Sequence, residues 1–154
     1  MSKKAQEIDE MDARIMRELI ADSGRSFRSL GKQVGLSPAA LVERIKSLER
    51  KGVITGYGAR VNYLVLGFEF MAIVEISMSG KNLISIEEKI AKLPHVAAVW
   101  DTTGEYDALA VVMCKTRGEL SATVKRILGT EGVRKTNTNM VLNVVSRLTE
   151  FGEV

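Results

Sequence analysis

The chain has 154 residues and a formal net charge of +3 at pH 7, from 22 Lys and Arg against 19 Asp and Glu. This length fits one or two small domains, and an apolar fraction of 45% is enough for a packed core, which excludes a disordered chain. The single cysteine, Cys114, excludes an internal disulfide and a thiolate metal cage. Apolar runs fall short of the ~20 residues of a membrane helix, and residues 1–4 lack a signal-peptide core. We therefore expect a soluble, cytoplasmic protein with no membrane contact.

The positive charge is concentrated in one part of the chain. Residues 1–62 hold 12 basic and 8 acidic side chains, whereas residues 63–154 hold 10 and 11. Residues 24–60 hold eight basic side chains and only two acidic ones, Glu43 and Glu49. A local positive field of this kind predicts a surface that faces a polyanion.

Two helices are expected before residue 35. The first has apolar residues at three- and four-residue steps, an N-cap at Asp9 and a stop at residues 22–24. Its apolar positions are Ile8, Met11, Ile15 and Leu19. The second is expected from Ser26 to Val34, with Phe27, Leu30 and Val34 buried.

A third helix is expected from Pro38 to about Lys51. Ser37 is placed to cap its first amides, Pro38 suits the first helical position, and Gly52 ends the helix. Only residues 35–37 separate this helix from the second. This short link is typical of a helix-turn-helix.

From Val53 onward the apolar period changes to two, which indicates strands. Residues 53–62 are interpreted as a strand or wing, followed by a strand whose inner face carries alternate apolar residues. Those inner residues are Phe68, Phe70, Ala72, Val74, Ile76 and Met78. A helix marked by Leu83, Ile86, Ile90 and Leu93 follows.

The rest of the chain completes a second domain. Strands are expected at residues 95–102 and 106–114, around a three-residue loop, Thr103–Glu105, in which Gly104 supplies a positive φ. A helix marked by Leu120, Val124, Ile127 and Leu128 and a last strand over residues 134–147 follow. The order β-α-β-β-α-β is that of ferredoxin-like domains. We expect an α+β chain: a (winged) helix-turn-helix domain at residues 1–53, a linker strand at 54–66 and a ferredoxin-like domain at 67–154.

One face of the expected sheet is left without helices. On the first strand it carries Glu69, Met71, Ile73 and Glu75, and on the last Asn137, Asn139, Val141, Asn143 and Val145. Scattered surface apolar residues are common, but four on two neighbouring strands favour burial against a second subunit.

Residues suited to catalysis are few. His95 is the only histidine and follows Pro94 at a strand start, where a turn residue is the simpler interpretation. Cys114 ends an apolar strand and is interpreted as a core residue. Metal-ligand spacing is missing, and residues 56–58 form only a fragment of a dinucleotide fingerprint. We expect no catalytic residue, no metal and no cofactor.

The third helix carries the strongest functional signal. Leu41, Ile45 and Leu48 fall on its inner side, whereas small and basic residues fall on its outer side. Small residues permit close approach to the major groove, and Lys46 and Arg50 reach bases or phosphates. The alternative, an ordinary solvated helix face, does not explain the basic residues nearby. The candidate DNA-binding residues are Arg25, Arg28, Ser37, Ala39, Ala40, Glu43, Lys46, Ser47 and Arg50.

The chain resembles the Lrp/AsnC, or feast/famine, family of transcription regulators from about Ile8 to Phe151. The N-terminal motif residues are Ile8, Asp9, Asp12, Ile15, Gly24, Arg25, Gly35–Ser37, Arg44, Ile45, Leu48, Glu49, Gly52–Ile54, Gly56 and Tyr57, and the C-terminal ones are Thr103–Asp107, Thr138, Val141 and Leu142. The resemblance implies a recognition helix at residues 37–50, double-stranded DNA with a palindromic operator as partner, and a homodimer that assembles to an octamer or similar ring. It also implies a nucleoid-associated protein.

The resemblance further implies an amino-acid effector held between subunits. The effector residues would be Thr102, Gly104, Glu105, Tyr106, Asp107, Thr136 and Thr138. Asp107 would bind the ammonium group, and the Gly104 amide and the threonine hydroxyls would bind the carboxylate. A hairpin in which Gly104 and Asp107 are purely structural is the alternative.

Two rival functions come from other classes. Sirohaem decarboxylases have a similar two-domain architecture. They need ionisable groups around a tetrapyrrole, whereas this chain has a single histidine. The second rival is a stand-alone amino-acid-sensing or oligomerisation module, which would lack the helix-turn-helix. The basic segment 24–60 argues against such a module.

Overall fold

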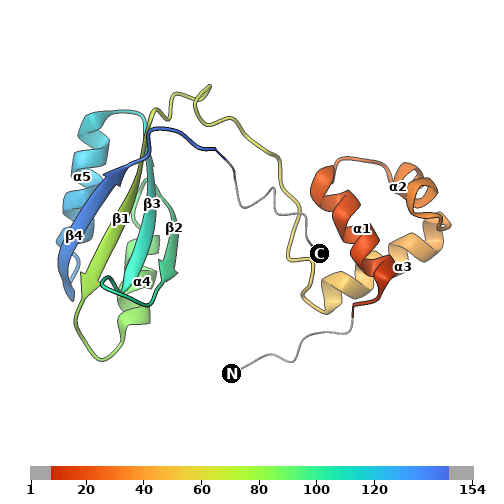
Figure 1. The fold of residues 1–154 in the computed structure, drawn as a ribbon, viewed down its shortest axis with the longest axis horizontal. Coiled ribbons are helices and arrows are strands. Elements are labelled where there is room, and N and C mark those ends of the chain that lie inside the picture. The colour runs from red at the N-terminus through yellow and green to blue at the C-terminus, as the bar shows by residue number, and fades with distance from the viewer. Residues whose placement is uncertain (1–7, 146–154) are drawn as a thin grey trace. The chain divides into compact units, whose positions relative to one another are not determined.

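The computed structural model describes residues 8–145, which form parts of two compact units. The first unit reaches Arg60 and the second spans Val61–Val144 (Figure 1). Residues 1–4, and the ends of the expected last strand and of the family resemblance at residues 147 and 151, lie outside the described residues. Within residues 8–145, none of the helices has the length and apolar character needed to cross a membrane.

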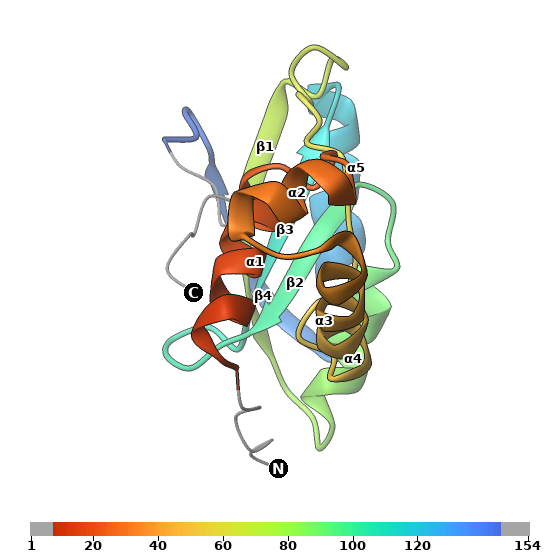
Figure 2. The same cartoon turned by 90° about the vertical axis from the view of Figure 1, so that its right-hand side faces the viewer.

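The first unit is built from the helices α1 (Glu10–Ala21), α2 (Phe27–Val34) and α3 (Pro38–Arg50), which are labelled in Figure 2. The expected caps are confirmed: the side chains of Asp9 and Ser37 accept from the amides of Asp12 and Ala40. The link between α2 and α3 turns at Gly35, whose φ of 78° is left-handed, and the Leu36 amide donates to Gly31 O. The core contains Ile15, Leu19, Leu30, Val34, Leu41 and Ile45.

The expected burial of Phe27 is wrong. This side chain is 45% exposed, whereas Leu30 and Val34 of the same helix are buried. Phe27 is the first residue of α2, and the core between the helices is filled by residues from the later turns. The helical stripe therefore identifies the inner face of α2 but not where along the helix the core begins.

The strand or wing expected over residues 53–62 is also absent. The segment has no regular secondary structure, and none of the four described strands pairs with it. It is held on the helices instead: the amides of Val53 and Ile54 donate to Leu48 O, and Arg60 donates to Ile20 O at 2.8 Å. A strand needs a partner ladder, and apolar alternation alone does not supply one.

The second unit contains β1 (Phe70–Met78), α4 (Leu83–Ala91), β2 (Val96–Asp101), β3 (Ala108–Cys114), α5 (Arg117–Leu128) and β4 (Val133–Met140). The strands form one antiparallel sheet in the order β2-β3-β1-β4. This confirms the α+β ferredoxin-like architecture. The core joins the sheet to both helices through Ala72, Val74, Ile76, Met78, Ile86, Ile90, Ala108, Ala110, Val112, Cys114, Leu120 and Ile127.

Two strand ends differ from expectation. The β2–β3 loop covers residues 102–107 rather than three residues, although Gly104 has the expected positive φ, 130°. The last strand ends at Met140 rather than near residue 147. Met140 pairs with Ala72, and Val141 N still donates to Met71 O, but β1 begins at Phe70, so the ladder loses its partner there.

The face of the sheet opposite the helices is partly apolar, as expected, and it includes further residues from β2 and β3. Ile73 and Trp100 are 37% and 48% exposed on this face, and Glu75 accepts from the side chain of Asn137. Val145 lies beyond the end of β4 at Met140, whereas Val141 is still hydrogen-bonded to Met71 O. By the pairing register, Met71, Leu109, Val111 and Met113 complete this open sheet face.

Candidate functional site

The outer side of α3 is exposed as expected for a DNA-reading helix. Leu41, Ile45 and Leu48 are buried and anchor the helix. The side chains on the other side are small at the N-terminal end and charged further along, and all are exposed: Ala39, Ala40, Glu43, Lys46 and Arg50, with Ser37 at the cap. Ser47 is different, because it is half-buried and lines the depression between α1 and α3.

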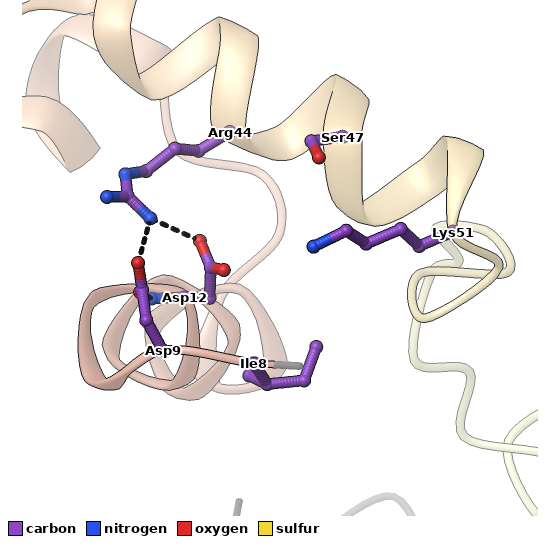
Figure 3. A pocket seen from close by; sticks show the side chains of 6 residues that line it. All are labelled: Ile8, Asp9, Asp12, Arg44, Ser47 and Lys51. Carbon is purple, nitrogen blue, oxygen red and sulfur yellow. Dashed lines mark hydrogen bonds and ion pairs between the residues drawn. The ribbon is translucent and has the colours of Figure 1, made fainter. Parts of the chain in front are cut away.

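A charged clamp holds α3 against α1 (Figure 3). One guanidinium nitrogen of Arg44 donates to Asp9 Oδ2 and to Asp12 Oδ1, each at 2.7 Å. The Arg44 hydrogen bond holds the pKa of the Asp9 carboxyl below its usual 3.8, and the two carboxylates raise the pKa of Arg44. The Asp12 side chain is only 11% exposed. The clamp therefore fixes the angle at which α3 presents its outer side.

Two of the arginines expected to contact DNA have partners within the unit. Arg25 pairs with Glu18 and Asp22 at 3.1 Å and donates to Gln33 Oε1, which ties the end of α1 to α2. Arg50 forms a 3.0 Å ion pair with Glu43 on the exposed side of α3. An exposed pair of this kind is weak, so Arg50 can exchange Glu43 for a phosphate. Arg28 is exposed on α2.

A tyrosine after α3 is hydrogen-bonded to the last turn of that helix. Tyr57 donates to Glu49 Oε1 at 2.8 Å, and burial together with that hydrogen bond raises the pKa of Tyr57 to about 12. The bond fastens the irregular segment 53–60 to the last turn of α3. Neither this pair nor the clamp could be predicted as a contact from the sequence, because the residues carry no mutual spacing signal.

The β2–β3 hairpin brings five of the expected effector residues together in a closed loop. The Thr102 amide donates to Asp107 O at 2.9 Å, and its hydroxyl donates to Tyr106 O at 3.1 Å. Asp107 Oδ2 accepts from the Met78 amide at 2.6 Å. Gly104 and Glu105 are exposed at the tip. One carboxylate oxygen of Asp107 thus accepts a hydrogen bond from the last residue of β1.

The other two expected effector residues lie one strand away. Thr136 and Thr138 lie on β4, where they pair with Ile76 and Val74 of β1. In the sheet, β1 separates β4 from the two strands that the hairpin joins. A neighbouring lysine reaches the hairpin instead: Lys135 Nζ lies 5.4 Å from the centre of the Tyr106 ring. Sequence reasoning missed Lys135, although a cation on the closing strand is a usable signal for a carboxylate ligand.

A buried carboxyl group underlies this end of the sheet. Glu87 of α4 is 7% exposed, and its Oε1 has no hydrogen-bond partner. Burial raises the pKa of Glu87, and the negative charges of Asp101 and Asp107 raise it further. The helical period marks Glu87 only as a polar residue beside Ile86, so the sequence gives no sign of its burial.

Known proteins match this chain over both units. The AsnC-type helix-turn-helix domain matches residues 8–49, and the Lrp/AsnC ligand binding domain matches residues 71–151. An uncharacterized HTH-type transcriptional regulator of Pyrococcus furiosus is 40% identical over 139 residues, covering 90% of this chain and 94% of the relative. The HTH-type transcriptional regulator FL11 of the same organism is 32% identical, covering 94% and 95%.

Solved structures of regulators of this kind are also similar to the chain. AsnC of E. coli is similar with a TM-score of 0.83 and 26% identity, covering 92% of this chain and 97% of that one. The feast or famine regulatory protein of M. tuberculosis, complexed with L-methionine, is similar with a TM-score of 0.81 and 29% identity, covering 90% and 95%. Both units, the exposed outer side of α3 and these matches lead to one conclusion: the chain belongs to the Lrp/AsnC family of transcriptional regulators.

Proposed function

We propose that this regulator reads double-stranded DNA with α3. The single observation that carries the proposal is the exposed outer side of α3, small at its N-terminal end and bearing Lys46 and Arg50 further along, on a helix fixed by the Arg44 clamp. The small end enters the major groove, and the basic end contacts phosphate or base edges. Arg28 contributes a backbone contact from α2. Arg25 acts within the unit, because its guanidinium already has three partners.

The open sheet face supports a homodimer. Ile73 and Trp100 are exposed beside half-buried apolar neighbours, and a second copy of this face would remove them from water. A twofold dimer presents two α3 helices, so the operator is an imperfect palindrome with half-sites one or more helical turns apart. Assembly of such dimers into a ring would give the octamer or a related form.

A free amino acid is the proposed effector, bound at the hairpin. Asp107 keeps one carboxylate oxygen beyond its bond to the Met78 amide, and the nearby negative charge of Asp101 favours a cationic ammonium group. The Gly104 amide and Lys135 are the donors for the ligand carboxylate, with Thr136 and Thr138 supplied by the same or another subunit. The bound L-methionine of the M. tuberculosis regulator supports this class of ligand. The protein acts without an enzymatic step or a cofactor.

One experiment tests the regulatory function. Genomic DNA fragments are selected on the purified protein, with and without the twenty amino acids, and the enriched fragments are sequenced. Enrichment of fragments sharing a palindrome, altered by one class of amino acid, is the expected result. Equal recovery of all fragments would contradict sequence-specific binding. A visible absorption band of bound tetrapyrrole in the purified protein would favour the decarboxylase alternative instead.

Calorimetry tests the effector site separately. Asp107→Asn keeps an oxygen for the Met78 amide but removes the charge, and loss of a charge-assisted contact of about 1.5–3 kcal/mol lowers affinity roughly 10- to 150-fold. Glu131→Gln, an exposed carboxylate elsewhere on the unit, is the matched control. If no amino acid binds below millimolar concentration, the hairpin is structural and the effector proposal is wrong.

A further inference from the structure

Three side chains that are far apart in the sequence meet at one end of the second unit. His95 precedes β2, Cys114 ends β3, and Glu119 lies in the first turn of α5. The ligand atoms of these three residues all lie within 4.8 Å of one another. We infer that His95, Cys114 and Glu119 form a binding site for a transition-metal ion of the zinc class.

The donor set selects the type of ion. One imidazole nitrogen, one thiolate and one carboxylate oxygen suit Zn²⁺, which accepts all three ligand types, whereas Mg²⁺ and Ca²⁺ require oxygen ligands throughout. Ligand atoms around tetrahedral Zn²⁺ lie about 3.5 Å apart, so ligand atoms that already lie within 4.8 Å of one another need only a small further approach. Three protein ligands leave a fourth position for water.

The carboxylate is already oriented by the backbone. Glu119 Oε2 accepts from the amides of Lys115 and Thr116 at 2.8 and 3.3 Å, and the Thr116 side chain accepts from the Glu119 amide in return. This capping box holds the carboxylate beside the end of β3 and leaves Oε1 as the ligand atom. Hydrogen bonds of this kind to a ligating carboxylate are typical of metal sites, where they fix the ligand in place.

The histidine has an unusual backbone. His95 has a φ of 67° and is the one non-glycine residue with positive φ among residues 8–145. Its carbonyl accepts from the Met113 amide at 2.9 Å, which fixes the residue next to the end of β3. Non-glycine residues in this region cost energy and cluster at ligand sites. Here the conformation places the imidazole beside Cys114.

The sulfur environment fits a ligand. Cys114 is fully buried in the core, so solvent does not compete for its sulfur. The hydroxyl of Thr123 on α5 is buried, faces this sulfur, and has no hydrogen-bond partner of good geometry. A metal-bound thiolate would accept that unused donor. A bound ion would thus link the start of β2, the end of β3 and the first turn of α5.

Metal titration of the full-length protein tests the site. Apo protein, prepared by chelation and dialysis, is titrated with Zn²⁺ in a calorimeter and with Co²⁺ in a spectrophotometer. We expect one ion per chain, the visible bands of tetrahedral Co²⁺, and a thiolate-to-cobalt charge-transfer band in the near ultraviolet. Zn²⁺ should also raise the melting temperature of the protein.

Three variants are chosen to spare the fold. His95→Asn tolerates the positive φ, Glu119→Gln keeps the capping box, and Cys114→Ala leaves a small apolar residue. Each should lower the affinity for the ion at least tenfold, and Cys114→Ala should also abolish the charge-transfer band. Glu88→Gln, an exposed carboxylate on α4, should bind as the wild type does.

Circular dichroism establishes that each variant is folded before it is titrated. Binding of Co²⁺ without a thiolate band would overturn the proposal, as would wild-type affinity in Cys114→Ala or failure of the folded apo protein to take up either ion. These outcomes are independent of DNA and amino-acid binding.

Discussion

Asp12 and Arg44 are 32 residues apart in the chain, yet a 2.7 Å hydrogen bond joins the carboxylate of one to the guanidinium of the other. Asp12 is buried on α1, and Arg44 lies on the helix that carries the proposed DNA contacts. The pair therefore links the stability of the first unit to the orientation of α3, and it separates residues that position α3 from the residues proposed to contact DNA.

Arg44→Met should destabilise the first unit. Methionine keeps the apolar stem but leaves the Asp12 carboxylate without its donor, which costs about 1–3 kcal/mol in the free energy of unfolding. Arg50→Met is the matched control, because the Arg50–Glu43 pair is exposed, and it should change stability by less than about 0.5 kcal/mol. Urea unfolding followed by circular dichroism measures both, and equal effects would contradict the clamp.

The double variant Lys46→Ala, Arg50→Ala should bind DNA more weakly with an unchanged melting temperature, since both side chains are exposed. If each side chain neutralises one phosphate, the slope of log affinity against log salt should fall by about 0.9 per residue. Lys92→Ala, the same loss of charge on the second unit, is the control. Fluorescence anisotropy on a selected operator measures the slope, and an unchanged slope would contradict the phosphate contacts.

Glu43→Gln should act in the opposite direction on the same surface. It removes a negative charge from the outer side of α3 and releases Arg50 from its 3.0 Å ion pair. Affinity for non-operator DNA should rise, most clearly at low salt, where exposed charges are least screened. Weaker binding to operator and non-operator DNA alike would show that Glu43 contacts DNA rather than restraining Arg50.

Acid should weaken the clamp through Asp9. Because the pKa of Asp9 lies below 3.8 in the folded state, the unfolded state binds more protons, and the stability that Asp9 contributes above pH 3.8 is lost as the pH falls through its folded pKa. Asp9→Asn retains an N-cap but carries no charge. It should be less stable than the wild type at pH 6, and the difference should shrink towards pH 2 in urea unfolding.

Glu87→Gln should show the reverse dependence in the second unit. The pKa of Glu87 is raised above 4.5 by burial, so the stability contributed by its neutral form is present at low pH and is lost as the pH rises through the folded pKa. Glutamine keeps the shape without the charge. The variant should match the wild type below pH 4 and exceed its unfolding free energy at pH 7; no difference at pH 7 would contradict a destabilising buried charge.

The sequence was sufficient for the order of elements and for the inner faces, because periodicity and caps such as Asp9 and Ser37 are local signals. It failed where the outcome depended on a partner. Residues 53–62 alternate like a strand but find no ladder, β4 stops where β1 ends, and Phe27 lies beyond the core. The outer side of α3 was predictable, whereas Arg25, Glu87 and Lys135 depend on contacts between distant segments.

The pairing register of the second unit places the residue 102–107 hairpin far from the end of the sheet at which the chain enters and leaves. Phe70 begins β1 and Met140 ends β4 beside Ala72, so the chain enters and leaves the sheet at one end, while the residue 102–107 hairpin lies at the other. Nine residues of β1 span about 30 Å between those ends. A ligand at the hairpin therefore has no direct contact with the segments that lead out of its own sheet. The ligand would therefore influence DNA binding by changing how copies of the chain associate. Because association depends on protein concentration, the sensitivity of a promoter to the effector should vary with that concentration.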